Sequence, residues 1–156
     1  MNIKKKISFV LATFFGVGYS PIAPGTVGSF VTLPMAFALS FLGGWPLLLS
    51  VALFIYIAGV WTTRTVLKYT PHDPSFVVID EVVGQLLTFT LISDIYPLGV
   101  LWLAGGFAAF RFFDILKPWP VSYFDKKWEN ASGVMMDDVM AGFYAACVLK
   151  LIHLFC

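Results

Sequence analysis

Five apolar runs separated by short polar segments constrain the fold of this chain more than any other feature of its sequence. Each run is continuous, whereas the strands of a membrane barrel alternate apolar with polar residues. We therefore expect an all-α protein, a transmembrane helical bundle with about five crossings. Several runs are shorter than the ~20 residues that span a bilayer squarely, so flanking residues must extend them. The runs cover residues 29–42, 46–62, 82–92, 98–113 and 139–155.

The composition supports a lipid environment. Hydrophobic residues make up 59% of the 156 residues and charged residues only 12%, with a mean hydropathy of +0.85. Soluble domains are roughly half apolar and a quarter charged. A chain this poor in polar residues cannot cover its own surface in water. We expect one integral-membrane domain over residues 1–156, with the bilayer as a partner and no nucleic-acid partner.

The positions of the cationic residues predict the orientation of the bundle. The links at residues 43–46 and 93–97 carry no lysine or arginine, whereas the N-terminus and the two longer polar loops do. If all five runs cross the membrane, these cationic segments lie on one side, which the positive-inside rule makes cytoplasmic. Lys150 is the exception, and it can extend outward from the last helix. The cations of the two loops include Arg64, Lys68, Lys117, Lys126 and Lys127.

An additional apolar run at residues 7–17 follows a lysine cluster at residues 4–6 and is too short for a further crossing. We expect a short helix that lies at the inner membrane interface. A secretory signal peptide is the alternative, because it also places an apolar run after lysines. Pro21, Pro24 and the lack of a small-residue cleavage pattern argue against that alternative.

Carboxylates collect at the cytoplasmic ends of three predicted helices. Asp80 and Glu81 begin the third crossing, Asp114 ends the fourth, and Asp137 and Asp138 begin the fifth. Mg²⁺ prefers such oxygen ligands and often keeps waters and a substrate phosphate in its coordination shell. Charged groups this close to hydrocarbon are candidates for function. The pattern therefore predicts a divalent-cation site formed by acids from separate helices.

Helix capping is the simpler interpretation of a single acid at a helix start, because aspartate is a preferred N-cap. Asp80 or Asp137 alone would be explained in this way. A cap uses one side chain, however, and leaves the second acid of each pair unexplained. The two adjacent pairs therefore favour a site over two caps.

The segment at residues 110–118 adds complementary positive charges. Arg111 and Asp114 share a helix face, as do Asp114 and Lys117 if the helix continues that far. Pro118 indicates that it ends near there. Arg111 lies in an apolar run, so its guanidinium must meet a carboxylate or bind a phosphate through its planar fork. A purely structural Arg111–Asp114 pair and a membrane-anchoring role for Lys117 are the alternatives.

Small residues and prolines at residues 18–29 predict a compact loop ahead of a helix that starts near Ser29. Backbone N–H groups of such a loop can hold an anion, which makes Gly25, Thr26 and Ser29 candidate phosphate-binding residues. The segment is not a P-loop, because no lysine follows its last glycine. A plain connecting turn would explain it equally well.

The positions of the histidines limit the catalytic mechanisms that are possible at the acidic residues. His72 and His153 are the only two, and His153 belongs to the far end of the last predicted helix. No Ser-His-Asp or Cys-His arrangement is therefore available near the acids, apart from an isolated His72 that fits a surface loop. Metal-assisted hydrolysis remains, with carboxylates holding Mg²⁺ and cations binding a phosphate.

Four separated segments then match a known pattern in order and spacing. They are residues 20–29, 78–84, 110–118 and 136–142, which read SPIAPGTVGS, VIDEVVG, FRFFDILKP and MDDVMAG. The chain resembles the phosphatidylglycerophosphatase A family over nearly its whole length. The resemblance implies a Mg²⁺-dependent lipid phosphatase of the bacterial inner membrane that converts phosphatidylglycerophosphate to phosphatidylglycerol. The charge pattern predicts that its active site is cytoplasmic.

Our hypothesis gives the charged residues separate roles at one site. The expected cation ligands, which also supply a catalytic base, are Asp80, Glu81, Asp137 and Asp138. The expected phosphate-binding residues are Gly25, Thr26, Ser29, Arg111 and Lys117. Asp114 would orient Arg111 or join the cation ligands. Either water or an aspartate can attack phosphorus, and the sequence does not choose between them.

Other functions compete with this hypothesis. A small ion or proton transporter also keeps acids in a membrane, but it would place them at mid-membrane in broken helices. A non-catalytic assembly subunit gives no reason for acidic pairs beside an arginine and a lysine. A lipid phosphotransferase needs a longer spaced aspartate pattern, which is not evident here. The sequence leaves the number of metal ions, the oligomeric state and the acyl-chain preference open.

Overall fold

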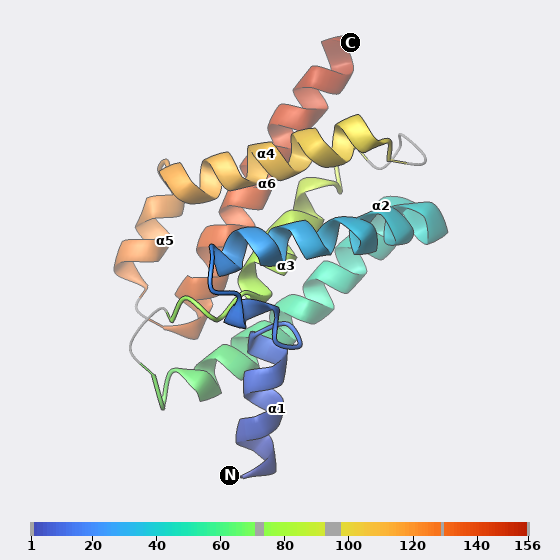
Figure 1. The fold of residues 1–156 in the computed structure, drawn as a ribbon. Coiled ribbons are helices and arrows are strands. Elements are labelled where there is room, and N and C mark those ends of the chain that lie inside the picture. The colour runs from blue at the N-terminus through green and yellow to red at the C-terminus, as the bar shows by residue number, and fades with distance from the viewer. Residues whose placement is uncertain (1, 71–73, 93–97, 129, 156) are drawn as a thin grey trace.

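A computed structural model describes residues 2–70, 74–92, 98–128 and 130–155 of the protein, and all regular structure in these residues is helical. The expected all-α fold is thus confirmed (Figure 1). The predictions for His72 and for the link at residues 93–97 lie outside the described residues. The elements are α1 (Ile3–Ala12), a short 3₁₀ turn η1 (Val17–Tyr19), α2 (Pro24–Val66), α3 (Ile79–Thr88), α4 (Val100–Leu116), α5 (Val121–Lys127) and α6 (Ala131–Phe155).

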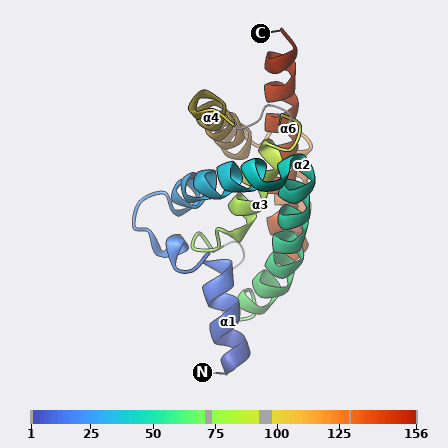
Figure 2. The same ribbon diagram turned by 90° about the vertical axis from the view of Figure 1, so that its right-hand side faces the viewer.

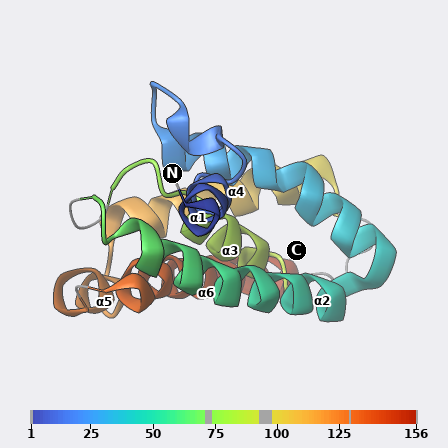
Figure 3. The ribbon, with the colours of Figure 1, turned by 90° about the horizontal axis from the view of Figure 1, so that it is seen from below.

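α2 joins two of the predicted apolar runs, residues 29–42 and 46–62, in one 43-residue element with a sharp bend at Gly44. Gly44 has φ 62° and ψ −152°, a backbone conformation that glycine alone adopts readily. After the bend the second arm returns toward the side from which the first arm came, as Figures 1 and 3 show. The expected link between the first two crossings is therefore a glycine bend within one helical hairpin.

α3 is shorter than the apolar run at residues 82–92 predicts. Its ten residues rise about 15 Å, roughly half the hydrocarbon thickness of a bilayer. The helix lies in the middle of the bundle (Figure 2), where Val82 and Leu86 pack in one buried cluster with Leu48 and Leu149. The apolar side chains of α3 therefore contact protein instead of lipid, and a complete crossing by this run is not confirmed.

α6 begins earlier than its apolar run at residues 139–155 predicts. The side chain of Asn130 accepts hydrogen bonds from the backbone N–H groups of Ser132 and Gly133, at 2.9 and 3.1 Å, and so caps the helix. Asp137 and Asp138 consequently lie about two turns inside α6. The prediction that these acids begin the helix was wrong, because the polar cap lies ahead of the apolar run.

Two of the described helices, α2 and α6, are long and apolar enough to cross a membrane. α4 has 17 residues and is about 25 Å long, slightly less than the hydrocarbon thickness. The expected number of about five crossings is therefore not confirmed. Large apolar side chains are exposed along both arms of α2, as a lipid-facing surface requires, and they include Phe30, Phe41, Leu42, Leu53 and Phe54.

α1 includes the lysines at residues 4–6 and ends before the apolar run at residues 7–17 is complete. Phe14, Phe15 and Gly16 have positive φ, so the chain turns sharply before η1. Lys5 places its Nζ atom 3.8 Å from the centroid of the Tyr69 ring. This cation–π contact holds α1 beside the residues that follow α2.

The helix ends that carry the acids meet on one side of the bundle. Figures 1 and 3 both place the end of α4, α5 and the start of α6 on the left, opposite the bend of α2. Glycines allow the helices to approach closely there. A Cβ atom on Gly84 would collide with Phe110 of α4 and with the backbone of Asp138, and one on Gly142 would collide with the backbone of Gly84. α3, α4 and α6 are therefore packed tightly, which brings their acids together.

Candidate active site

A cavity of about 270 Å³ lies where α2 and α3 begin, α4 ends and α6 enters the bundle. Nine of the ten candidate residues line it, and the tenth, Ser29, contacts the lining residue Arg111. Segments that are far apart in the sequence thus meet at one polar site. The candidate residues in its lining are Gly25, Thr26, Asp80, Glu81, Arg111, Asp114, Lys117, Asp137 and Asp138.

Three of the acids form a compact cluster. Carboxylate oxygens of Asp80, Glu81 and Asp138 all lie within 4.8 Å of one another. Asp80 and Asp138 are 7% and 4% exposed, so the cluster is largely removed from water. Oxygen donors at this spacing and in this number suit a hard divalent cation. The cluster can therefore hold a metal ion between α3 and α6.

Neither acidic pair caps a helix. Val78 occupies the N-cap position of α3, and Asp80 Oδ1 accepts a hydrogen bond from the N–H group of the next residue, at 3.1 Å. Asp137 Oδ1 likewise accepts from Asp138 N, at 3.0 Å, inside α6. The capping interpretation of these acids is therefore wrong, because the hydrogen bonds that define an N-cap are missing.

Burial and mutual repulsion make the cluster electrostatically unfavourable as a group of anions. Burial, and then the neighbouring Glu81 carboxylate, raise the pKa of Asp80 well above its usual range. Burial also raises the pKa of Glu81. Like charges in a site of low dielectric cannot all ionise unless a cation or protons offset them. The acids therefore fit a bound divalent cation by their charge as well as by their spacing.

Arg111 is held at the edge of the cavity by contacts with two helices. It forms an ion pair with Asp114, one turn further along α4, so the shared helix face is confirmed. Its Nη1 atom also approaches Ser29 Oγ of α2, at 3.5 Å, whereas its Nε atom is buried with no partner among the described residues. The side chain of Arg111 is 16% exposed, so the guanidinium retains some access to the cavity.

Lys117 contacts a different helix. α4 ends at Leu116, and Lys117 follows in a left-handed conformation with φ 45°. Its Nζ atom lies 2.9 Å from Asp137 Oδ2, which joins the end of α4 to α6. Asp137 thus lies next to a cation, apart from the three clustered acids. Lys117 is a lining residue of the cavity and not only a membrane anchor.

The glycine- and proline-rich segment is helical earlier than predicted. α2 starts at Pro24 and not near Ser29, so Gly25 and Thr26 belong to its first turn. The first N–H groups of a helix have no acceptor within the helix, and the helix dipole favours anions at that end. Because both residues line the acidic cavity, the start of α2 offers donors to an anion bound there.

Sequence analysis missed four further lining residues, Ala23, Pro24, Ser75 and Val77. Ser75 and Val77 precede α3 in an irregular segment, and no motif or charge pattern distinguishes them in the sequence. Ala23 has φ 44°, a left-handed conformation that is unusual for a residue other than glycine. Ala23, with its strained backbone, thus lies directly before the first turn of α2, which forms one wall of the cavity.

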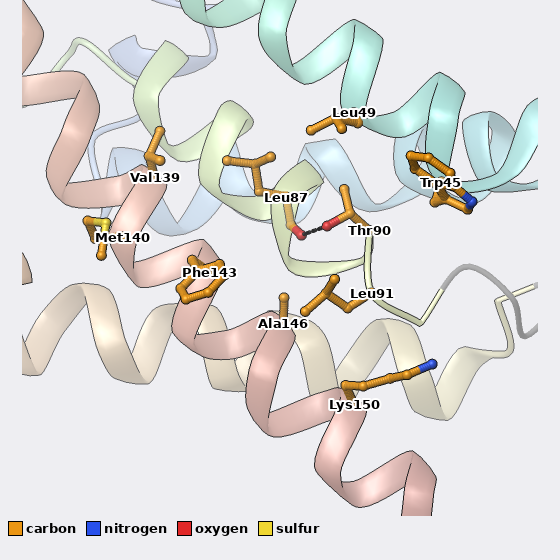
Figure 4. A pocket seen from close by; sticks show the side chains of 10 residues that line it. All are labelled: Trp45, Leu49, Leu87, Thr90, Leu91, Val139, Met140, Phe143, Ala146 and Lys150. Atoms are coloured by element: carbon orange, nitrogen blue, oxygen red, sulfur yellow. Dashed lines mark hydrogen bonds between the residues drawn. The ribbon is translucent and has the colours of Figure 1, made fainter.

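A larger cavity of about 840 Å³ lies elsewhere, between the second arm of α2, the end of α3 and α6 (Figure 4). None of its lining residues lines the acidic cavity. Its walls are apolar apart from Thr90, Lys150 and the Trp45 indole nitrogen, and Thr90 donates its hydroxyl hydrogen to the Leu87 carbonyl. This cavity suits hydrocarbon, and its described lining residues include no carboxylate that could hold a cation.

The sequence matches the family model described as phosphatidylglycerophosphatase A over residues 10–153. A Haemophilus influenzae protein named phosphatidylglycerophosphatase A is 41% identical, with 95% of this chain and 93% of the relative covered. An Escherichia coli protein of the same name is 36% identical, with 92% of this chain and 81% of the relative covered. A Bacteroides thetaiotaomicron protein, provisionally named a phosphatidylinositol-3-phosphatase, is 39% identical, with 90% of this chain and 92% of the relative covered. No solved structure matches the chain.

Proposed function

The chain belongs to the phosphatidylglycerophosphatase A family, and on that premise we propose that it hydrolyses phosphatidylglycerophosphate to phosphatidylglycerol and inorganic phosphate. The observation that carries the proposal is the acidic cavity, in which three clustered carboxylates lie beside an arginine, a lysine and a helix N-terminus. Acids and cations in one cavity match the needs of a phosphate ester with a bound cation.

The phosphate-binding groups come from two helices. Arg111 presents a planar fork that pairs with two phosphate oxygens, and Lys117 supplies a second positive charge. The N–H groups in the first turn of α2, at Gly25 and Thr26, donate to a further oxygen. Asp114 orients Arg111 through their ion pair, and Ser29 supports the same guanidinium. The phosphate would thus be held by groups from the start of α2 and the end of α4.

Asp80, Glu81 and Asp138 would hold a divalent cation, for which we propose Mg²⁺ because it prefers carboxylate and phosphate oxygens. A bound cation would polarise a phosphoryl oxygen and offset the charge that develops on it. The three carboxylates keep such a cation at the boundary between α3 and α6. Their burial excludes competing water and strengthens each electrostatic contact.

Asp137 is the candidate base, because it faces the cavity apart from the three clustered acids and its pairing with Lys117 fixes its position. In the proposed reaction, Asp137 takes a proton from a water molecule as the water oxygen forms a bond to phosphorus. The bond between phosphorus and the glycerol oxygen breaks, and Asp137 gives the proton it accepted to that oxygen, which leaves as the hydroxyl of phosphatidylglycerol. One water is consumed and one phosphate is released.

A comparison of two lipid headgroups tests the proposed substrate. Purified protein is supplied with phosphatidylglycerophosphate or phosphatidylinositol 3-phosphate in matched detergent micelles, and released phosphate is measured. We expect kcat/KM to be at least about tenfold higher for phosphatidylglycerophosphate, because its phosphate is a flexible primary ester that reaches a cavity near the bilayer surface. Equal or higher kcat/KM for the inositol lipid would contradict the proposed substrate.

We also propose that the protein lies in the inner membrane with about five crossings and with its N-terminus and acidic cavity facing the cytoplasm. In this arrangement α1 lies along the inner interface. Ile3, Ile7 and Val10 form an exposed apolar stripe on α1, and Lys4 and Lys6 lie on either side of it. A cysteine introduced at Lys4 should resist an impermeant maleimide in intact spheroplasts and react after lysis, with Cys147 and Cys156 replaced by serine.

Gly25→Ala should lower kcat/KM by about a hundredfold without unfolding the protein. A Cβ atom at this position would overlap a carboxylate oxygen of Glu81, so that side chain must move, and it would lie 3.4 Å from Arg111 Nη1. Gly105→Ala is the control, because its Cβ atom would meet only Leu149, at an ordinary 3.8 Å. The control should retain wild-type activity and melt at the same or a higher temperature. A Gly25→Ala variant with wild-type kcat/KM would contradict this account of the site.

A further inference from the structure

Gln85 lies on α3 one turn deeper in the bundle than Glu81, and its side chain is fully buried. Neither its amide nitrogen nor its amide oxygen has a hydrogen-bond partner among the described residues. A buried polar group without a partner destabilises a fold, and an apolar side chain of similar volume would avoid that effect. Packing alone therefore does not explain an amide at this position.

The unpartnered polar atoms of the protein concentrate behind the acidic cavity. Six buried side-chain atoms lack a partner in the described residues, and four of them belong to Glu81, Gln85 and Arg111. Gln85 lies behind Glu81 on the same helix face, because residues four apart on a helix are neighbours. Glu81 Oε2 is one of the four atoms. An amide donor and a carboxylate acceptor thus lie one turn apart, both buried and both unpaired.

The opposing face of α2 is small and polar. A Cβ atom on Gly25 would overlap the Glu81 carboxylate, so this face of α2 meets α3 directly. Ser29 and Thr32 continue the same face and are fully buried. Their hydroxyls donate to carbonyls of α2 itself, each at 2.8 Å. The face of α2 that continues from Gly25 into the bundle therefore carries buried hydroxyl groups at Ser29 and Thr32.

We propose that Gln85 is a positioning residue whose amide N–H group donates a hydrogen bond to Glu81 Oε2 when the site holds a divalent cation. The proposal rests on the proposed function, because it assumes that the clustered acids bind the cation. In the structure, carboxylate oxygens of Asp80 and Glu81 lie within 4.8 Å of one another. A cation held between the two groups would use one oxygen of Glu81. The unpartnered Oε2 atom would then need a donor from the protein.

The test compares Gln85→Met with the wild-type protein in detergent. Methionine has nearly the volume of glutamine and no amide, so the variant should melt at the same or a higher temperature in EDTA. The Mg²⁺ concentration that gives half of the thermal stabilisation should rise about tenfold, because one hydrogen bond to a charged ligand is lost. The Mg²⁺ midpoint for phosphate release should rise by a similar factor. Gln85→Leu repeats the test with a second apolar side chain.

Thr88→Val is the matched control. Thr88 is also fully buried on α3, but its hydroxyl already donates to the Gly84 carbonyl, at 2.9 Å, and it lies one turn further from the acids. Its Mg²⁺ midpoint should equal that of the wild type. Unchanged midpoints in both Gln85 variants would overturn the proposal. Absence of phosphate release from the wild type would contradict the proposed function instead, because the thermal midpoints test Gln85 without any turnover.

Discussion

Asp138→Asn should lower kcat for phosphate release by about a thousandfold or more, while the protein remains folded. Asp138 is one of the three acids whose oxygens lie within 4.8 Å of one another, and it is the member that α6 contributes. Asparagine keeps the shape of the side chain but removes its charge. The remaining pair, Asp80 and Glu81, would then hold a divalent cation weakly and in the wrong position.

Thermal unfolding in EDTA separates loss of the site from loss of the fold. The wild-type cluster holds several carboxylates in a buried space, so removal of one negative charge should leave the melting temperature unchanged or raise it. Mg²⁺ should stabilise the wild type against unfolding and stabilise the variant much less. An active Asp138→Asn variant with wild-type kcat would exclude this residue from the catalytic machinery.

Arg111→Lys should lower kcat/KM by about a hundredfold even though the charge is kept. Arg111 contacts both Asp114 and Ser29 through its Nη1 atom, and the other nitrogens of its planar guanidinium carry further N–H donors. A lysine ammonium can satisfy Asp114 but cannot also pair with two phosphate oxygens. The measurement is the initial rate of phosphate release over a range of substrate concentrations.

Arg64→Lys provides the control for this substitution. Arg64 is exposed near the end of α2 and does not line the acidic cavity. Its replacement should leave kcat/KM within about twofold of wild type, since an exposed cation there contributes little beyond its charge. A comparable loss in both variants would mean that the effect is not specific to the position of Arg111 at the cavity. Full activity of Arg111→Lys would show that the planar fork is not needed.

The helical fold, and most of the residues that line the acidic cavity, could be predicted from short patterns in the sequence. The continuous apolar runs correctly predicted an all-α fold, and Pro118 correctly predicted where α4 ends. The acidic pairs and Arg111 stand out because charged residues are rare in an apolar chain. Such residues must find partners when buried, so they gather at one place. That physical requirement explains why sequence motifs on four helices indicated one cavity.

The lengths of the helices and the pairing within the site depend on tertiary contacts that no local pattern contains. The short α3 is apolar because other helices surround it, and its sequence alone cannot distinguish protein from lipid as the neighbour. Asp137 and Asp138 are adjacent, yet they point about 100° apart on α6 and meet different partners. Lys117 selects Asp137 only because the end of α4 lies beside α6. No sequence pattern pointed to Gln85 as a candidate residue, because a single amide in an apolar helix belongs to no motif.

The central claim is that the acidic cavity performs metal-assisted hydrolysis of a lipid phosphate. The most direct test measures phosphate released from phosphatidylglycerophosphate by the purified wild-type protein, first in EDTA and then with excess Mg²⁺ restored. The account predicts negligible release in EDTA and recovery of turnover with Mg²⁺, from a protein that stays folded in both conditions. Equal rates in EDTA and in Mg²⁺ would contradict the account, because the clustered carboxylates would then have no cation to hold.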